Sequence, residues 1–149
     1  MGELTAAAYV RDGILDADHW YAAELRDAAG RAAEAELLVA VEQDRVVGTI
    51  TRAPYGTPWA EIAGPGEHEL RMLAVDPVAR GRGVAEALVR DAIRRAGADG
   101  AAAVVLTTVS TMTAAQRLYA RLGMARVPER DWTVEAGAAL VYVAHLADD

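Results

Sequence analysis

The stretch from residue 80 to residue 85 has the residue types of an anion-binding site. It reads RGRGVA and lies where an apolar segment gives way to apolar residues at helical spacing. The first amides of a helix have no intrahelical acceptor and lie at the positive end of the helix dipole, so they bind anions. Glycines let a phosphate approach the backbone, and Arg80 and Arg82 would add forked hydrogen bonds. The stretch predicts a phosphate site, with a tight turn that needs glycine and binds nothing as the alternative.

Residue spacing excludes two common phosphate motifs. A mononucleotide P-loop requires lysine and then serine or threonine after its last glycine, but Val84 and Ala85 follow Gly83. A dinucleotide fingerprint would require a third glycine at the position of Glu86. The phosphate ligand is therefore expected to be of another kind.

The elements that must position this site are read from the hydrophobic period. Strands are predicted over residues 36–42, 45–51, 69–75, 101–106, 125–127 and 139–146. Helices are predicted over residues 3–10, about 17–35, 83–97 with Gly97 as the stop, and about 112–122. The polar pair at 43–44 suits a hairpin, and residues 53–66 are expected to form a loop. Strand, glycine-rich turn, helix and strand follow one another from Glu69 to Leu106, which indicates a crossover between parallel strands.

Composition limits the class of protein. The chain has 149 residues, is 53% hydrophobic and has no apolar run long enough to cross a bilayer, so we expect one domain over residues 1–149. The formal net charge of -7, with acidic residues scattered along the chain, argues against nucleic acid or an anionic membrane as the main partner. An export signal and cysteines are both missing, so the cytoplasm is the expected location.

Two signatures in this chain belong together. The segment LAVDP at 73–77 leads into RGRGVA, and AAQRLYARLGM follows at 114–124. In this order and at this separation, residues 68–124 resemble the GNAT superfamily of acyl-coenzyme A dependent N-acetyltransferases. The resemblance implies an α/β fold with a mixed, mostly antiparallel twisted sheet flanked by helices. It also implies acetyl-CoA as co-substrate and no metal.

The resemblance also assigns residues to the cofactor. In this family the strand before the first signature is splayed from the next strand by a bulge, and its free backbone groups pair with the pantetheine arm. The matching residues here are Leu73, Ala74 and Val75. The diphosphate would rest on the turn made of Arg80, Gly81, Arg82, Gly83, Val84 and Ala85.

Tyr119 and Glu69 are the candidates for proton transfer. Acetyl transfer to an amine expels a thiolate, and family members often use a tyrosine at the place of Tyr119 to protonate it. The amine must first lose a proton, and some members place a glutamate base where Glu69 stands. A packed Tyr119 with an inert hydroxyl, and Glu61, Glu67 or His68 in place of Glu69, remain the alternatives.

This chain departs from the family pattern at two places. An asparagine that often bonds the cofactor is replaced by Met112, so Ser110 or Thr111 is expected to supply a polar contact and to cap the helix. The usual first strand is not evident before residue 36, which would leave the strand at 36–42 as an edge. We expect that edge to be covered, by a partner subunit in a homodimer or by the tail.

The acceptor lies where the family varies most. Candidate lining residues are Tyr9, His19, Trp20, Tyr55, Trp59, Glu129, Asp131 and Trp132. Aromatic and acidic groups together suit a cationic amine. The predicted function is acetyl transfer from acetyl-CoA to a primary amine of a small molecule, by direct attack in a ternary complex. The alternatives are a protein N-terminal or lysine acetyltransferase, and a non-catalytic module that binds acyl-CoA.

Overall fold

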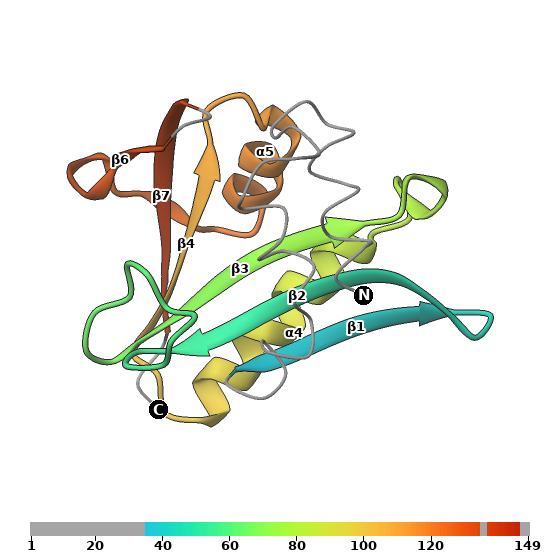
Figure 1. The fold of residues 1–149 in the computed structure, drawn as a ribbon, viewed down its shortest axis with the longest axis horizontal. Helices are drawn as coiled ribbons and strands as arrows, with labels where there is room; N and C mark the ends of the chain where they lie inside the picture. The colour runs from blue at the N-terminus through green and yellow to red at the C-terminus, as the bar shows by residue number, and fades with distance from the viewer. Residues whose placement is uncertain (1–34, 135–136, 147–149) are drawn as a thin grey trace.

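The fold is a mixed sheet of seven strands, with two helices on one face of it, over the residues that the structure describes (Figure 1). The structure is a computed structural model, and it describes residues 35–134 and 137–146. Its strands are β1 Glu36–Glu42, β2 Arg45–Pro54, β3 Glu67–Val75, β4 Ala103–Val109, β5 Ala125–Arg126, β6 Trp132–Val134 and β7 Gly137–His145. The helices are α4 Val84–Ala98 and α5 Thr113–Arg121, with short 3₁₀ turns η1 Pro77–Ala79 and η2 Pro128–Arg130. The helices predicted before residue 35 lie outside the described residues.

The strands are ordered β1-β2-β3-β4-β7-β5, with β6 paired to β7. Only β3 and β4 run parallel to each other, and α4 connects them, so the predicted crossover is confirmed. The other described pairs are antiparallel, which confirms the predicted mixed sheet. The predicted hairpin is also found, because Gln43 and Asp44 turn with φ of 49° and 63°, as a two-residue turn between twisted strands requires.

A bulge in β3 opens the sheet. Thr51 of β2 pairs with Arg71 and Thr49 pairs with Ala74, so two residues of β3 oppose one residue of β2. One of the two is Met72, whose φ of 58° is unusual for a side chain of that size. The ladder between β3 and β4 ends just before this bulge, at the pair Leu70 and Leu106 (Figure 1). Beyond that pair the two strands diverge, and the backbone of residues 71–75 has no ladder partner on the β4 side.

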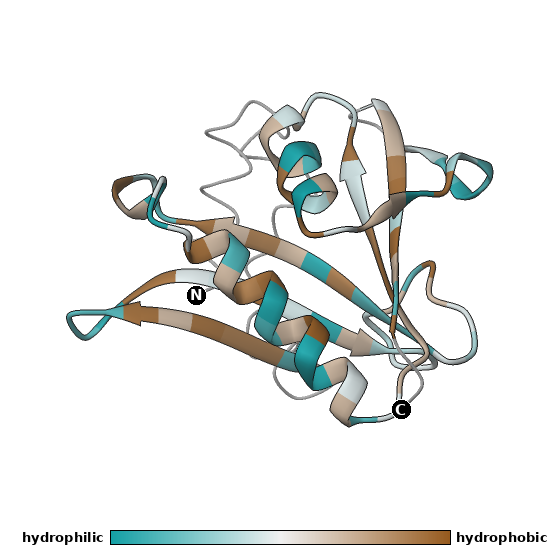
Figure 2. Ribbon diagram, turned by 180° about the vertical axis from the view of Figure 1, so that it is seen from behind, coloured by the Kyte–Doolittle hydropathy of each residue, from teal (hydrophilic) through white to brown (hydrophobic). Residues whose placement is uncertain are grey.

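Helix α4 packs across β1, β2 and β3 with one apolar face. Leu88, Val89, Ala92 and Ala96 are buried against the sheet, and the ribbon of α4 alternates hydrophilic and hydrophobic bands in Figure 2. Gly48 of β2 allows the close approach. A Cβ atom there would lie 2.9 Å from Val84 Cγ1 and 3.0 Å from Leu88 Cδ1. The first turn of α4 is therefore held directly on the sheet.

Several predicted boundaries are wrong for local reasons. Helix α4 runs through Gly97, the predicted stop, and ends before Gly100, whose φ of 87° makes the left-handed turn instead. The strand expected from residue 101 starts at Ala103, because the Ala101 amide bonds the carbonyl of Ala96 and closes the helix end. Strand β6 is not among the predicted strands, and β3 starts at Glu67, two residues earlier than predicted.

The expected cap of α5 is also wrong. Met112 occupies the N-cap, and no side chain caps the helix there, so neither Ser110 nor Thr111 has that role. The Gln116 side chain instead donates a hydrogen bond of 3.0 Å to the Ser110 carbonyl and holds the turn before the helix.

Strand β1 is the outermost strand of the described sheet, and the side chains of Val39 and Val41 are exposed on it. Whether an additional strand precedes β1 concerns residues outside the described ranges. Neither α4 nor α5, the α-helices of the described ranges, combines the length and the apolar character that a membrane span requires.

Candidate active site

The turn between η1 and α4 presents a row of amides that have no backbone acceptor in the part of the chain that the structure describes. The first hydrogen bond of α4 runs from the Ala87 amide to the Gly83 carbonyl, at 3.0 Å. Within the described residues, the amides of residues 81–86 therefore have no backbone acceptor. They lie at the positive end of a fifteen-residue helix, where an anion is stabilised by the dipole and by direct N–H donation.

Two glycines give this turn its shape. Gly81 and Gly83 have φ of 82° and 78°, a region that L side chains adopt only with strain. A Cβ atom built on either glycine would have no other atom within 4 Å. A side chain at either position would therefore meet no other described residue, so the glycines are not needed to relieve crowding inside the protein. They allow the turn, and they leave the amides accessible.

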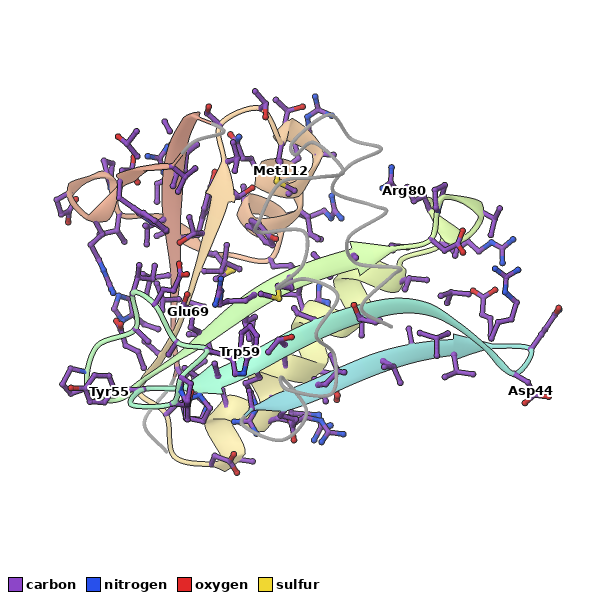
Figure 3. All side chains as sticks on the ribbon, viewed as in Figure 1. Asp44, Tyr55, Trp59, Glu69, Arg80 and Met112 are labelled. Atoms are coloured by element: carbon purple, nitrogen blue, oxygen red, sulfur yellow. The ribbon has the colours of Figure 1, made fainter. Side chains whose placement is uncertain are left out.

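The two arginines of the turn lie in different surroundings. Arg82 forms an ion pair with Glu42 at the end of β1, and the Arg82 side chain is exposed whereas that of Glu42 is partly buried. Arg80 lies at the end of η1, beyond the far end of β3 (Figure 3). Asp76 holds the segment between β3 and η1. Its side chain accepts a hydrogen bond from the Val78 amide and pairs with Arg45 at 3.2 Å.

The open edge of β3 continues from this turn into the sheet. Leu73 and Val75 pack in apolar clusters that both include Val84 and Ala85, so they lie on the α4 face of the sheet. Their backbone faces the opening between β3 and β4, where no ladder forms. The structure thus brings residues 73–75 and 80–85 together along one side of the opening.

Tyr119 lies on the same face, in α5. Its side chain is 5% exposed, and its ring centroid is 5.7 Å from that of Tyr142 in β7. Burial, with a smaller effect of Tyr142, raises the pKa of the Tyr119 phenol well above its usual value. The phenol therefore keeps its proton at neutral pH. No hydrogen bond to the Tyr119 hydroxyl is found within the described ranges, which leaves the hydroxyl uncommitted.

Glu69 lies on the opposite face of β3 and is 2% exposed. Its Oε1 accepts hydrogen bonds from the amides of Glu61, Ile62 and Ala63, at 2.7, 2.8 and 3.0 Å. Its Oε2 is 3.9 Å from Nε of Arg71. Burial raises the pKa of the Glu69 carboxyl above its usual value, although the three amides act in the other direction.

Glu69 is one of three charged residues on this face of β3 that hold the loop before the strand. Glu67 accepts two hydrogen bonds of 2.9 Å from Arg130 of η2, and Arg130 also donates to the Ile62 carbonyl at 2.8 Å. Arg71 donates to the Trp59 carbonyl at 2.9 Å and contacts Glu61 at 3.3 Å. The loop from 59 to 64 is therefore tied to β3 and η2 through several points.

The remaining acceptor candidates are distributed unevenly. Trp59 lies over β2 and β3 near Glu69, whereas Tyr55 is exposed and points away from the sheet (Figure 3). The Trp132 indole nitrogen is 3.5 Å from Thr107 Oγ1, and Asp131 accepts a hydrogen bond from the Val141 amide. Glu129 lies in η2. Tyr9, His19 and Trp20 lie outside the described residues.

Sequence reasoning did not single out Arg71, and it gave Glu67 only as an alternative base. Both share a face of β3 with Glu69, since residues two apart in a strand point the same way. Charges at 67, 69 and 71, on one face of a strand whose residues 70 and 72–75 are apolar, are a signal of function or of buried pairing. No group of three or more His, Asp or Glu side chains in the described ranges is placed to hold a metal ion.

Comparison with known proteins gives one family. The Acetyltransferase (GNAT) family model matches residues 4–124. N-acetylaspartate synthetase of Danio rerio is 45% identical over 67 residues, which are 44% of this chain and 24% of that protein. N-acetyltransferase 8B of Homo sapiens is 32% identical over 109 residues, which are 72% of this chain and 46% of that protein. The chain thus spans less than half the length of either relative.

Solved structures share the fold. A GNAT family acetyltransferase of Staphylococcus aureus matches with a TM-score of 0.75 and 15% identity, over 97% of this chain and 90% of that one. A Bacillus subtilis acetyltransferase in complex with CoA matches with a TM-score of 0.65 and 18% identity, over 80% of this chain and 82% of that one. These similarities show that the overall fold is shared with these proteins.

Proposed function

The chain belongs to the GNAT acetyltransferase family, and from the site we propose that it transfers an acetyl group from acetyl-CoA to a primary amine of a small molecule. The transfer occurs by direct attack of the amine in a ternary complex. The observation that carries the proposal is the row of accessible amides at residues 81–86, next to the open edge of β3.

The residues on the α4 face fit acetyl-CoA. The open space at the Cβ positions of Gly81 and Gly83 leaves room for a diphosphate beside amides that have no backbone acceptor among the described residues. Residues 73–75 have free backbone groups toward the opening, which suit the amides of a pantetheine arm. A bound acetyl-CoA supplies a thioester, whose acetyl group an amine can accept.

Tyr119 is proposed as the general acid. Its phenol stays protonated at neutral pH because burial raises its pKa, so it has a proton to donate to the departing sulfur. Its hydroxyl has no hydrogen bond to another described residue that would have to be broken first. The alternative of a packed tyrosine with an inert hydrogen bond is therefore not favoured.

Glu69 is proposed as the general base. Its Oε1 is committed to three amides of the loop, so Oε2 is the oxygen that would take the proton of the acceptor, directly or through water. A carboxyl whose pKa is raised by burial is a better base near neutral pH than an exposed one. Glu67 is a poorer candidate, because Arg130 binds both of its oxygens and lowers its pKa.

Two other functions are possible for this site, and they differ from the proposed one either in the size of the acceptor or in the absence of catalytic turnover. The name N-acetylaspartate synthetase implies an amino acid as acceptor, which favours a small molecule here as well. A protein N-terminal or lysine acetyltransferase would use the same cofactor site with a larger acceptor. A non-catalytic acyl-CoA sensor would use only the turn and the edge of β3.

Two measurements test the proposal. Calorimetry should detect binding of CoA to the purified chain, and the absence of binding would overturn the proposal. Release of free thiol from acetyl-CoA should then be followed across small amines, free amino acids and peptides. Turnover with small amines supports the proposal, turnover with peptides alone supports the protein acetyltransferase, and binding without turnover supports the sensor.

We also propose that β1 is covered by a second copy of the chain. The strand is the outermost of the described sheet and exposes Val39 and Val41. Sedimentation at micromolar concentration should then show a dimer, and a monomer would contradict this part of the proposal.

A further inference from the structure

A threonine of β4 lies on the second wall of the opening in the sheet. The ladder between β3 and β4 ends at the pair Leu70 and Leu106, and beyond this pair the two strands diverge (Figure 1). Thr108 is two residues further along β4, so the register of the ladder, continued past its end, places it opposite Met72 and beside residues 73–75. The wall that faces the open edge of β3 therefore includes Thr108.

The side chain of Thr108 lies on the face of the sheet that α4 and α5 cover. Residues two apart in a strand share a face, and Leu106 packs in the core cluster that includes Leu118 and Tyr119 of α5. Leu140, the residue of β7 that pairs with Thr108, packs against the same cluster. Thr108 and Tyr119 thus share one face of the sheet, and they are buried to a similar degree, at 3% and 5% exposed.

The hydroxyl of Thr108 has no hydrogen-bond partner among the described residues. The side-chain amide of Gln116 in α5 donates instead to the carbonyls of Val109 and Ser110, at 3.5 and 3.0 Å. The polar contact expected from Ser110 or Thr111 would come from exposed residues. A buried polar group without a partner costs free energy, and a valine would fill the same space without that cost. The unpartnered hydroxyl therefore indicates a group that binds to it.

We propose that the Thr108 hydroxyl forms a hydrogen bond with an amide of the pantetheine arm of CoA and so positions the arm. A hydroxyl can donate to the carbonyl of an amide and can accept from its N–H, so either half of the amide suits it. Residues 73–75 offer backbone groups from β3, and Thr108 holds the arm from the side of β4. The inference rests on the proposed function, because CoA has to occupy the opening, and it adds a residue to that site.

Calorimetry with CoA and urea unfolding of the full chain test the proposal together. Thr108→Val keeps the branched shape of the side chain and removes only the hydroxyl. Because an unpartnered hydroxyl destabilises the free protein, the variant should unfold at a higher urea concentration than the wild type. Its affinity for CoA should nevertheless be about tenfold weaker, which corresponds to the loss of one hydrogen bond. Higher stability with unchanged affinity would overturn the proposal.

Thr51→Val is the matched control. Thr51 of β2 is 1% exposed, and its hydroxyl also has no partner in the described ranges. It lies on the face of the sheet opposite α4, since its neighbour Ile50 packs in the core cluster that includes residues of α4. Thr51→Val should gain stability in the same way as Thr108→Val but should keep the wild-type affinity for CoA. Equal losses of affinity in the two variants would contradict the proposed contact.

Two further comparisons locate the contact on the arm. Thr108→Ser keeps the hydroxyl and should recover most of the affinity for CoA that Thr108→Val loses. The nucleotide half of CoA, a phosphoadenosine diphosphate, contains the diphosphate but lacks the arm. Its affinity should be the same for wild type and Thr108→Val, and a loss equal to that for CoA would place the effect at the turn and overturn the assignment.

The same measurements distinguish failure of this inference from failure of the proposed function. If the wild type does not bind CoA, both are overturned. If the wild type binds CoA and Thr108→Val binds it equally well, only the role of Thr108 is overturned. CoA binding that depends on Thr108, without acetyl transfer to any amine, supports this inference and overturns the transfer.

Discussion

At the residue scale, Tyr119 is buried, and its hydroxyl makes no hydrogen bond to another residue of the described ranges. Tyr119→Phe keeps the ring against Tyr142 and removes only the proton donor. We expect kcat to fall about 100-fold at neutral pH, the usual size of a general acid effect. The KM for acetyl-CoA should change little. Steady-state kinetics with the best acceptor measures both quantities.

The control for this variant is Tyr142→Phe, which removes a hydroxyl from the other ring of the same pair. Its kcat should remain above that of Tyr119→Phe by at least about tenfold. Because burial raises the pKa of Tyr119, no alkaline loss of activity due to this phenol is expected below pH 10. Unaltered turnover in Tyr119→Phe would remove the proposed acid.

Glu69 has two roles that two substitutions can separate. Glu69→Gln keeps an oxygen for the amides of Glu61, Ile62 and Ala63 but cannot accept the proton. It should lower kcat about 100-fold with little change in the melting temperature. Glu69→Ala removes both roles and should also lower the melting temperature, because three buried amides lose their acceptor.

The pH profile gives a further check on Glu69. The wild-type kcat should fall as the pH drops through the raised pKa of the carboxyl, because the protonated form is no base. This acid limb should be absent from the residual activity of Glu69→Gln. An acid limb that persists in Glu69→Gln belongs to another group and would contradict the assignment.

At the scale of elements, α4 has a left-handed glycine just outside each end. Gly83 and Gly100 have φ of 78° and 87°, and a Cβ on either would meet no atom within 4 Å. Alanine at either position should therefore cost a similar backbone strain of about 1 kcal/mol. Only the Cβ at 83 would stand in front of the proposed diphosphate site.

Alanine substitutions at Gly83 and Gly100 should therefore differ in CoA affinity but not in stability. Gly83→Ala should weaken CoA binding by about tenfold or more, whereas Gly100→Ala should leave the affinity unchanged, and both should unfold at similar denaturant concentrations. Calorimetry with CoA and urea unfolding measure the two quantities. Equal affinities in the two variants would favour a turn that needs glycine but binds nothing.

The sequence predicts those elements whose structure depends on residues near one another in the chain. It misses features that depend on contacts between residues far apart in the chain. The helical spacing of apolar residues in α4 and the Gln43–Asp44 turn can be predicted, because each depends on residues close together in the chain. The sequence pattern places the helix end at Gly97, but Gly97 lies on the exposed side of α4 and continues the helix, and Gly100 makes the turn. The three amides on Glu69 come from a loop whose path depends on β3 and η2, so no local pattern could predict them.

At the scale of the whole molecule, a polar cluster around the buried Arg52 joins three strands to the end of α4. Arg52 of β2 is 6% exposed and contacts Glu36 at 2.9 Å, Asp99 at 2.8 Å and Nδ1 of His68 at 2.8 Å. Since the guanidinium is always a donor, His68 accepts through Nδ1 and is neutral. Burial, together with the charge of Arg52, lowers the pKa of His68.

This cluster predicts a loss of stability in mild acid. The unfolded chain takes up a proton on His68 near pH 6.5, and the folded chain does so only at lower pH. As the pH falls from about 6.5 toward the lower pKa of the folded state, the unfolded state therefore binds more protons and the free energy of unfolding decreases. The slope for one proton is at most about 1.4 kcal/mol per pH unit.

Urea unfolding between pH 7.5 and pH 5 measures the effect. His68→Gln can still accept from Arg52 but does not titrate, so the difference between wild type and variant isolates the histidine. A difference that does not vary with pH would show that His68 titrates alike in both states.

The loop from 59 to 64 has a consequence for how an acceptor binds. Glu67, Glu69, Arg71 and Arg130 tie it down through backbone groups as well as side chains. A loop that is already ordered loses little conformational entropy when a small molecule binds beside it. Selectivity among acceptors is then fixed by shape and charge in advance, and association needs no slow rearrangement of this segment.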